Sequence, residues 1–171
     1  MILCMKFIRT NTPIAAVLAL VAGFSAVECL ALAGFDPDFE SAAARAKENG
    51  KPLFALFTGS DWCPWCIKLA DEVFSKPEFL DVATNACELA IVDFPQNPSG
   101  QTDGERRRNR MLLGMYGIEG FPTVVLLGAD GKEIHRGGYA PGGAKAWIEK
   151  FMKDAGKAAE ARKQPQQDDA S

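Results

Sequence analysis

The sequence predicts an α/β fold in which a mixed central β-sheet carries helices on both faces. Short continuous apolar runs, typical of buried strands, alternate along the chain with amphipathic helical patterns. Towards the end, Asp130-Gly131 is a turn signal between two strand-like segments, which predicts an antiparallel hairpin. Parallel strands that are joined by helices and followed by such a hairpin give a mixed sheet.

Each element has its own signal in the sequence. A first helix is expected over 36–50, because Phe39, Ala42 and Ala46 recur at helical spacing and Asn49-Gly50 is a stop signal. The other expected elements are a strand over Leu53–Thr58, a helix from Cys63 to the breaker Ser75-Lys76-Pro77, a helical turn or two over 78–84, a strand over 89–94, a loop over 95–104, a helix over 105–116, strands over Thr123–Leu127 and 133–139, and a last helix whose apolar face spans Ala144 to Ala155.

Composition indicates one globular domain behind an export leader. The chain has 171 residues, 47% of them hydrophobic and 24% charged, and its net charge of −3 does not favour nucleic acid as a partner. Lys6 and Arg9 precede an apolar stretch, and Ala31-Leu32-Ala33 is a small-residue cleavage site. We therefore expect a signal peptide over 1–33, a domain over 34–155 and a disordered polar tail over 156–171.

Two other interpretations of the N-terminus stay open. Residues 13–33 are long enough for an uncleaved membrane anchor, although Glu28 would then lie in the bilayer at a high cost. A lipoprotein would be cut before Cys29, and Glu28 is a poor neighbour for such a cut. Cleavage near Ala33 is favoured, and it predicts a periplasmic or secreted protein in an oxidising compartment.

The chemistry is concentrated in Cys63-Pro64-Trp65-Cys66, where a strand gives way to a helix. A helix N-terminus stabilises a thiolate at Cys63, and Pro64 suits the first helical position. Cys66 lies one turn further on the apolar side and is expected to be less exposed. The pattern favours a redox dithiol in which Cys63 is the nucleophile and Cys66 resolves the mixed disulfide.

Two alternatives to a redox dithiol were weighed on the same residues. Zinc requires four ligands, and the remaining candidates, Cys87 and His135, form no second closely spaced pair. A purely structural disulfide across so short a loop would constrain little of the unfolded chain. Both alternatives are disfavoured, and no metal is expected.

Two motifs in the right order resemble those of the thioredoxin superfamily. The run TGSDWCPWC at 58–66 resembles its active-site turn, in the form typical of exported bacterial thioredoxin-like proteins. The run YGIEGFPT at 116–123 is similar to its second signature, in which a cis proline faces the dithiol, and residues 131–139 fit its terminal hairpin. The resemblance spans 36–152, nearly all of the expected domain.

The resemblance implies roles for individual residues. It makes Cys63 the nucleophile, Cys66 the resolving thiol and Pro122 the cis proline, with Phe121 and Thr123 as substrate-contacting neighbours. Backbone groups beside Pro122 would then face an extended substrate strand.

Two positions depart from the family pattern. Thioredoxins carry a buried aspartate six residues before the nucleophile, where this chain has Phe57, so the proton route of the resolving cysteine is open. Pro64-Trp65 stands where thioredoxin has Gly-Pro. Because this dipeptide helps to set the reduction potential, the sequence leaves the direction of electron flow open.

Trp62, Pro64 and Trp65 complete the residues assigned to substrate binding. Trp65 is interpreted as an exposed docking side chain, whereas packing is the favoured interpretation of Trp62 and docking its alternative. Asp61 is interpreted as an exposed turn residue, with tuning of Cys63 as the alternative.

Some residues outside the motif were given ordinary interpretations. Cys87 is expected to be an inert core thiol rather than a third redox cysteine, and His135 a solvated hairpin residue. The arginines at 106, 107, 108 and 110 are expected to form a solvated helix face rather than a site for an acidic partner.

The sequence thus predicts an exported thiol–disulfide oxidoreductase that uses Cys63 and Cys66 to reduce, isomerise or oxidise protein disulfides. We expect a monomer without a cofactor, which acts on protein thiols or disulfides and takes electrons from a membrane redox protein. Superfamily habit favours reduction or isomerisation over net oxidation. The alternative is a thioredoxin-fold chaperone or binding module whose dithiol is secondary.

Overall fold

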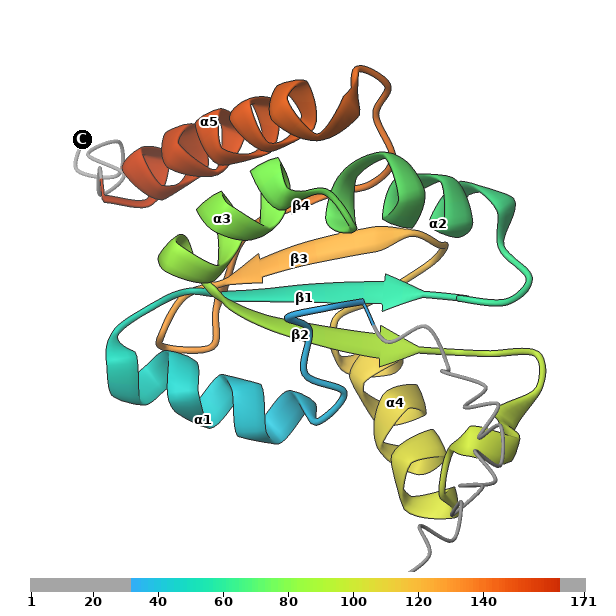
Figure 1. Cartoon of the computed structure of the whole chain (residues 1–171). Coiled ribbons are helices and arrows are strands. Elements are labelled where there is room, and N and C mark those ends of the chain that lie inside the picture. Colours follow the sequence, from blue (N-terminus) through green and yellow to red (C-terminus); the bar gives the residue numbers. More distant parts are fainter. Residues whose placement is uncertain (1–31, 164–171) are drawn as a thin grey trace, which may run out of the picture.

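The computed structural model describes residues 32–163, which form a mixed sheet of 4 strands (Figure 1). The strands are β1 (Leu53–Thr58), β2 (Glu88–Asp93), β3 (Thr123–Leu127) and β4 (Glu133–Gly137), in the order β2-β1-β3-β4. β1 is parallel to β2, whereas β3 runs antiparallel to both β1 and β4. The predicted mixed sheet with its terminal hairpin is confirmed.

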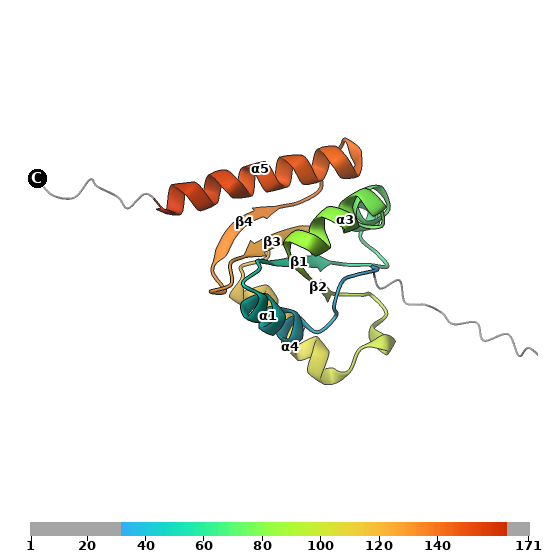
Figure 2. The same ribbon diagram turned by 60° about the vertical axis from the view of Figure 1, so that its left-hand side comes forward.

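Helices cover both faces of the sheet, as predicted (Figures 1 and 2). α1 and α4 lie on one face, and α2, α3 and α5 lie on the other. Their bounds are α1 (Phe39–Asn49), α2 (Pro64–Leu69), which continues as a π-helix (Ala70–Phe74), α3 (Pro77–Ala86), a 3-10 turn (Pro98–Gly100), α4 (Asp103–Met115) and α5 (Gly143–Lys163).

Alternation along β1 sends its side chains into two separate cores. All of β1 is buried, as the continuous apolar run predicts. Phe54 faces α3 and α5 and makes ring contacts with Phe79 and Trp147. Phe57 faces α1 and α4 instead, and its ring lies 6.1 Å from that of Tyr116. Phe57 therefore lies on the face of the sheet opposite to α2.

The N-terminal segment seals the free edge of β2. Phe35 is only 6% exposed, and its ring lies 6.0 Å from that of Phe54. The Asp36 backbone N–H donates to the Leu89 carbonyl (3.0 Å), and the Ile91 N–H donates to the Asp36 carbonyl (2.9 Å). Leu32 is also buried in this core, at 8% exposure, so the described chain lies in the core from its first residue. The leader, anchor and lipoprotein interpretations concern residues that lie largely outside the described range.

Some predicted boundaries are corrected by caps. The first helix begins at Phe39 rather than residue 36, because Asp38 caps it by accepting a hydrogen bond from the Ser41 N–H (3.1 Å). α4 begins at Asp103 rather than residue 105, because Thr102 and Glu105 form a reciprocal capping box. The predicted turn or two over 78–84 is a complete helix, α3.

The prediction of a disordered tail from residue 156 is wrong for residues 156–163. α5 continues to Lys163, past the predicted end at Ala155. Its last turns are rich in alanine and charged residues with high helix propensity, which an apolar pattern does not reveal. Residues 164–171 lie outside the described range.

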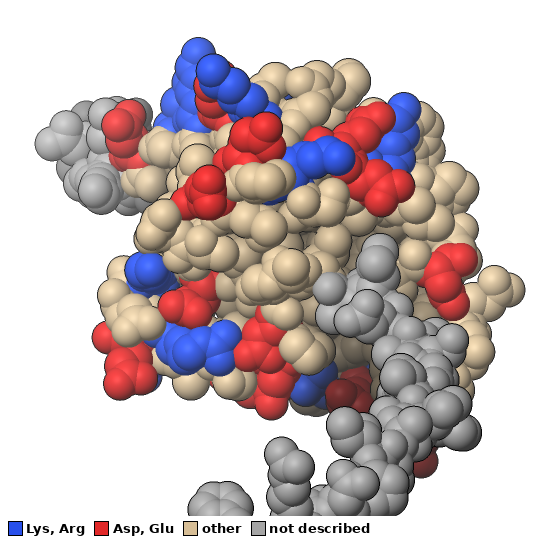
Figure 3. Space-filling view, viewed as in Figure 1, with Lys and Arg blue, Asp and Glu red and all other residues tan. Residues whose placement is uncertain are grey.

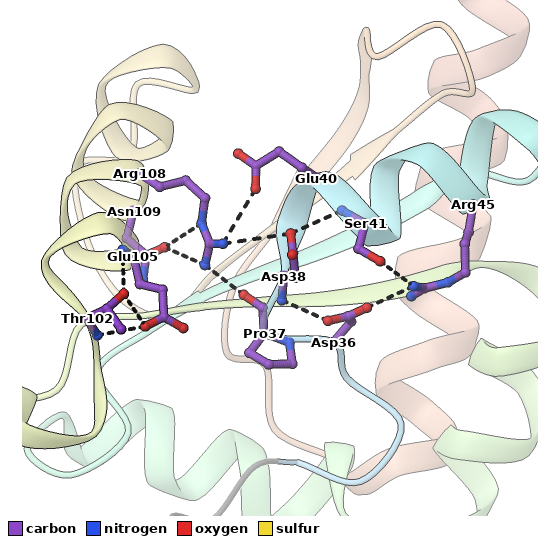
Figure 4. A network of polar contacts seen from close by, with 10 residues as sticks. All are labelled: Asp36, Pro37, Asp38, Glu40, Ser41, Arg45, Thr102, Glu105, Arg108 and Asn109. Atoms are coloured by element: carbon purple, nitrogen blue, oxygen red, sulfur yellow. Dashed lines mark hydrogen bonds and ion pairs between the residues drawn. The ribbon is translucent and has the colours of Figure 1, made fainter.

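The prediction of a solvated arginine face on α4 holds only in part. Arg107 and Arg110 are exposed. Arg108 instead bridges α4 to the start of α1, donating to the Pro37 carbonyl (2.8 Å) and pairing with Glu40 at 3.5 Å (Figure 4). His135 also differs from its prediction, because it is half-buried with its ring 4.9 Å from that of Phe151.

Candidate active site

The two cysteines lie directly after β1, at the start of α2. Cys63 is the N-cap of the helix, and its Sγ accepts a hydrogen bond from the Cys66 backbone N–H (3.2 Å). Pro64 occupies the first turn, where its missing N–H costs nothing. Cys63 and Cys66 form a disulfide, with their Cα atoms 5.2 Å apart. Cys63 is 5% exposed and Cys66 is 3% exposed, so both sulfurs lie in a largely buried turn.

An aromatic stack lines one side of this turn. The Trp62 indole N–H donates to the Phe94 carbonyl (2.7 Å), and its ring meets Phe121 edge-on at 6.1 Å. Phe121 in turn stacks on Phe94 at 5.2 Å. The indole also covers Gly59 so closely that any larger residue there would collide with it. Trp62 nevertheless remains 46% exposed, so it both packs and presents an apolar surface.

Trp65 lies on the outer side of the dithiol and is 55% exposed. One part of its indole packs on Tyr139, whose ring centre lies 5.0 Å away. The Lys68 Nζ lies 5.5 Å from the Trp65 ring, and Tyr139 donates from its hydroxyl to Glu72 (2.9 Å). The Tyr139 hydroxyl and the Glu72 carboxylate together raise the pKa of Lys68. Trp65 is therefore held in place while much of its surface stays free.

The second motif lies at the same end of the sheet. The Phe121-Pro122 peptide bond is cis, as the family resemblance implies. Thr123, the next residue, pairs with Phe57 near the end of β1, which brings Pro122 to the edge that carries the cysteines. The Thr123 hydroxyl donates to the Gly120 carbonyl (2.7 Å). An open groove of about 430 Å³ runs beside Pro122, between Glu119 and Arg136.

A loop after β2 is tied to the active-site turn by residues that the sequence analysis did not assign to the site. Ser60 donates to the Asp93 carboxylate from both its N–H (2.9 Å) and its hydroxyl (2.6 Å). The Asp61 carboxylate accepts the N–H groups of Gln96 (2.8 Å) and Asn97 (3.1 Å), and these two bonds lower its pKa. Asp61 is thus an exposed turn residue, as predicted, which also fastens the loop. A charged residue at the end of the apolar run 89–93 was the available signal for Asp93.

The surroundings of Cys87 agree with the prediction made for it. Cys87 is buried at 3% exposure, and burial raises its pKa to about 11, as expected of a core thiol. Within residues 32–163, no group of three or more His, Cys, Asp or Glu side chains is arranged to hold a metal ion. No helix in that range has the length and apolar character needed to cross a membrane.

Known proteins resemble this chain in sequence. The model of a thioredoxin-like domain family matches residues 39–152. The disulfide bond reductase DsbH of Chlamydia pneumoniae is 38% identical over 112 residues, which is 66% of this chain and 67% of the relative. The thioredoxin-related protein DsbJ of the same organism is 31% identical over 99 residues, 58% of this chain and 28% of DsbJ.

Solved structures agree with these relatives. A structure of a DsbH oxidoreductase superimposes with a TM-score of 0.67 at 34% identity, covering 78% of this chain and 92% of the other. The oxidised C-terminal domain of Neisseria meningitidis DsbD shares the fold, with a TM-score of 0.51 at 24% identity over 67% of this chain and 90% of that domain. With the Cys63–Cys66 disulfide at the start of α2 and the cis Phe121-Pro122 bond, the chain belongs to the thioredoxin-like family and is a protein thiol–disulfide oxidoreductase.

Proposed function

We propose that the protein is an exported reductase of protein disulfides, with Cys63 as the attacking sulfur and Cys66 as the resolving sulfur. The observation that carries these roles is the hydrogen bond from the Cys66 N–H to the Cys63 Sγ, because such a bond favours the thiolate at Cys63. The name of the relative DsbH, a disulfide bond reductase, supports the direction. The leader-like sequence over 1–33 supports export to the periplasm or beyond.

The reaction follows from thiol–disulfide exchange. In the reduced protein, the Cys63 thiolate attacks one sulfur of a substrate disulfide and displaces the other as a thiolate. Cys66 then attacks the Cys63 Sγ, which releases the second substrate sulfur and leaves the Cys63–Cys66 disulfide. The substrate gains two electrons that the dithiol loses. A redox protein of the membrane is proposed to return them, and the chemistry requires no bound cofactor.

An extended segment of a protein substrate is proposed to bind across the dithiol. The groove beside Pro122 offers backbone groups that an extended segment could pair with, and Thr123 lines its wall. The exposed parts of Trp62 and Trp65 flank the cysteines and suit apolar side chains of a substrate. Pro64 and Phe121 are proposed to belong to the same substrate-binding surface as Trp62 and Trp65.

Insulin reduction in the presence of a small thiol reductant tests this function. Wild-type protein should accelerate precipitation of the insulin B chain, and Cys63→Ala should reduce the rate to that of the reductant alone, since no other thiol in the site can start the exchange. Cys66→Ala should instead accumulate mixed disulfides with substrates, visible on non-reducing gels. Equal rates for wild type and Cys63→Ala would refute the proposal.

Two further measurements separate the alternatives. The Cys63–Cys66 potential in a dithiothreitol redox buffer should lie near the reducing value of about −270 mV, whereas about −120 mV would indicate an oxidant. Pull-down with a Cys63→Ala/Cys66→Ala double variant tests the binding-module alternative. Retention of all clients by that variant would favour a chaperone, and their loss would favour the enzyme.

A further inference from the structure

The resolving cysteine needs a proton acceptor, and the position equivalent to the thioredoxin aspartate supplies none. Cys66 is 3% exposed. Burial disfavours a thiolate, as it does for Cys87 in the same molecule, whose pKa rises to about 11. Phe57 is apolar and faces the opposite side of the sheet. A different group must therefore take the proton when Cys66 becomes a nucleophile.

A small cavity adjoins Cys66 where such a group would be required. It has a volume of about 40 Å³ and is lined by Leu32 of the N-terminal segment, by β2, by the end of β1 and by the first turns of the helix that begins at Pro64. Its polar lining consists of Thr58, Ser60, Cys66 and Asp71. A cavity of roughly 10–15 Å³ admits one water molecule when polar partners are present. This cavity is large enough to hold water in contact with the Cys66 thiol and the two hydroxyls.

Ser60 connects this cavity to a carboxylate. Its hydroxyl donates to Asp93 Oδ2 at 2.6 Å, so the hydroxyl oxygen is left to accept a hydrogen bond from the cavity side. Asp93 pairs with Thr58 in the register of β1 and β2, which places it beside the cavity. The Asp93 carbonyl accepts the side-chain amides of Asn109 (2.9 Å) and Gln101 (3.0 Å), which hold the end of β2 in position.

We propose that Ser60 and Asp93 form a proton relay for Cys66, an inference that rests on the proposed resolving role of that cysteine. The Cys66 thiol donates its proton to cavity water, the water donates to the Ser60 oxygen, and Ser60 passes its own proton to Asp93. The Cys66 thiolate then bonds to the Cys63 Sγ and expels the substrate thiolate. Asp93 then releases the proton to solvent, and the expelled substrate thiolate takes up a proton from solvent.

Two other carboxylates, those of Asp71 and Asp61, lie near the site. Asp71 also lines the cavity, from the π-helical continuation of α2, but it is exposed. Asp61 lies on the active-site turn, where its carboxylate is occupied by the N–H groups of Gln96 and Asn97. Of these three carboxylates, Asp93 is the one that accepts a hydrogen bond from the hydroxyl of Ser60, which lines the cavity, and Asp71 provides a matched control.

The test isolates the step performed by Cys66. The full chain carries Cys4→Ala, Cys29→Ala and Cys87→Ala, so that only Cys63 and Cys66 react. The reduced protein is mixed with Ellman's reagent in a stopped-flow instrument. Attack by Cys63 releases the first thionitrobenzoate in a concentration-dependent phase. Attack by Cys66 on the resulting mixed disulfide releases the second in a concentration-independent phase, which is measured between pH 6 and pH 10.

Asp93→Asn should slow the second phase at pH 7 by about tenfold or more and move its pH midpoint upward, because the amide oxygen still accepts one of the two Ser60 bonds whereas the amide takes up no proton. The first phase should be unchanged. Ser60→Ala should slow the second phase similarly, Ser60→Thr should restore it, and Asp71→Asn should leave it alone. Ser60→Ala removes one hydroxyl from a surface turn and so tests the relay even where Asp93→Asn folds poorly.

Other outcomes overturn the relay. A faster second phase in Asp93→Asn would mean that the carboxylate only opposes the thiolate by its charge. An unchanged pH profile in both Asp93→Asn and Ser60→Ala would exclude it, and slowing by Asp71→Asn alone would transfer the role to Asp71. Failure of the proposed function is distinguishable, because the protein with Ser60 and Asp93 intact would then show no second phase that depends on Cys66.

Discussion

At the scale of single residues, the buried cysteines Cys66 and Cys87 lie in different surroundings. Cys66 adjoins a cavity lined by hydroxyls, whereas Cys87 lies in an apolar core between α3 and β2. Burial is the main reason that the pKa of Cys87 rises to about 11, with Lys51 opposing the rise and Glu88 adding to it. Burial disfavours the thiolate at both residues. It therefore makes Cys87 inert and makes a proton acceptor necessary at Cys66.

Cys87 should make the oxidised protein less stable in alkali. Between about pH 9 and pH 11 the thiol ionises in the unfolded chain but stays protonated in the folded one, so the folded state binds more protons and stability falls as pH rises. Each pH unit in this window should remove about 1.4 kcal/mol from the free energy of unfolding. Urea titrations at pH 8, 9, 10 and 11 measure the slope, and Cys87→Ala should flatten it. An equal slope in both proteins would contradict the assignment.

At the scale of elements, Arg108 links α4 to the start of α1 through polar contacts, in addition to the apolar core that the two helices share (Figure 4). Arg108→Ala should lower the free energy of unfolding by about 1–2 kcal/mol, since it removes a charge-assisted bond to the Pro37 carbonyl from a largely buried side chain. The neighbouring Arg107 is exposed, and Arg107→Ala should change stability by less than about 0.5 kcal/mol. Urea denaturation of both variants checks this, and similar losses would show that Arg108 has no special role.

The elements differ in how far the sequence could specify them. β1 and β3 were predicted to the residue, because each is a continuous apolar run buried on both faces. The start of α4 was predicted two residues too late, because residues 95–104 have the composition of a loop. The capping box formed by Thr102 and Glu105 nevertheless begins the helix at Asp103. The π-helical turn at Ala70–Phe74 has no local signature that an amphipathic pattern detects.

The residues of the candidate site also differ in how far the sequence could predict them. Cys63, Cys66 and Pro122 stand in local motifs, so their positions could be predicted. The bonds of Ser60 to Asp93 and of Asp61 to the loop join residues more than thirty positions apart. Such pairings depend on the register of β1 and β2, which cannot be determined from the sequence alone. Because Phe57 cannot accept a proton, the acceptor for Cys66 must be a residue that the pairing of β1 and β2 brings near, and the sequence alone does not identify it.

At the scale of the whole molecule, surface charge is mixed rather than concentrated. Figure 3 shows Lys and Arg side chains interspersed with Asp and Glu over the face that it presents. Long-range attraction of one class of charged partner is therefore not a feature of that face. The proposed recognition of substrates relies instead on the exposed apolar side chains of Trp62 and Trp65 and on the groove that Pro122 lines.

The whole fold also depends on how its N-terminal segment begins. Phe35 packs against Phe54, Phe74 and Phe79, and Asp36 bridges the free edge of β2. A leader cut after Ala33 leaves this segment in place, whereas a cut beyond Asp36 removes it. A chain that begins at Gly34 keeps Phe35 and Asp36 and loses the buried side chain of Leu32, so it should be the more stable of two chains that begin at Gly34 and at Pro37. A chain that begins at Pro37 should lose at least about 3–5 kcal/mol, the usual cost of deleting a buried phenylalanine side chain.

Urea denaturation of the two truncated chains measures this difference, and Phe35→Ala in the full chain gives the contribution of the ring alone. The N-terminal residue of the protein recovered after export should accordingly lie at or before Phe35, which sequencing of its N-terminus determines. Equal stability of the chains that begin at Gly34 and Pro37 would contradict the packing argument. A processed protein that begins after Asp36 would show that the edge of β2 is sealed in another way.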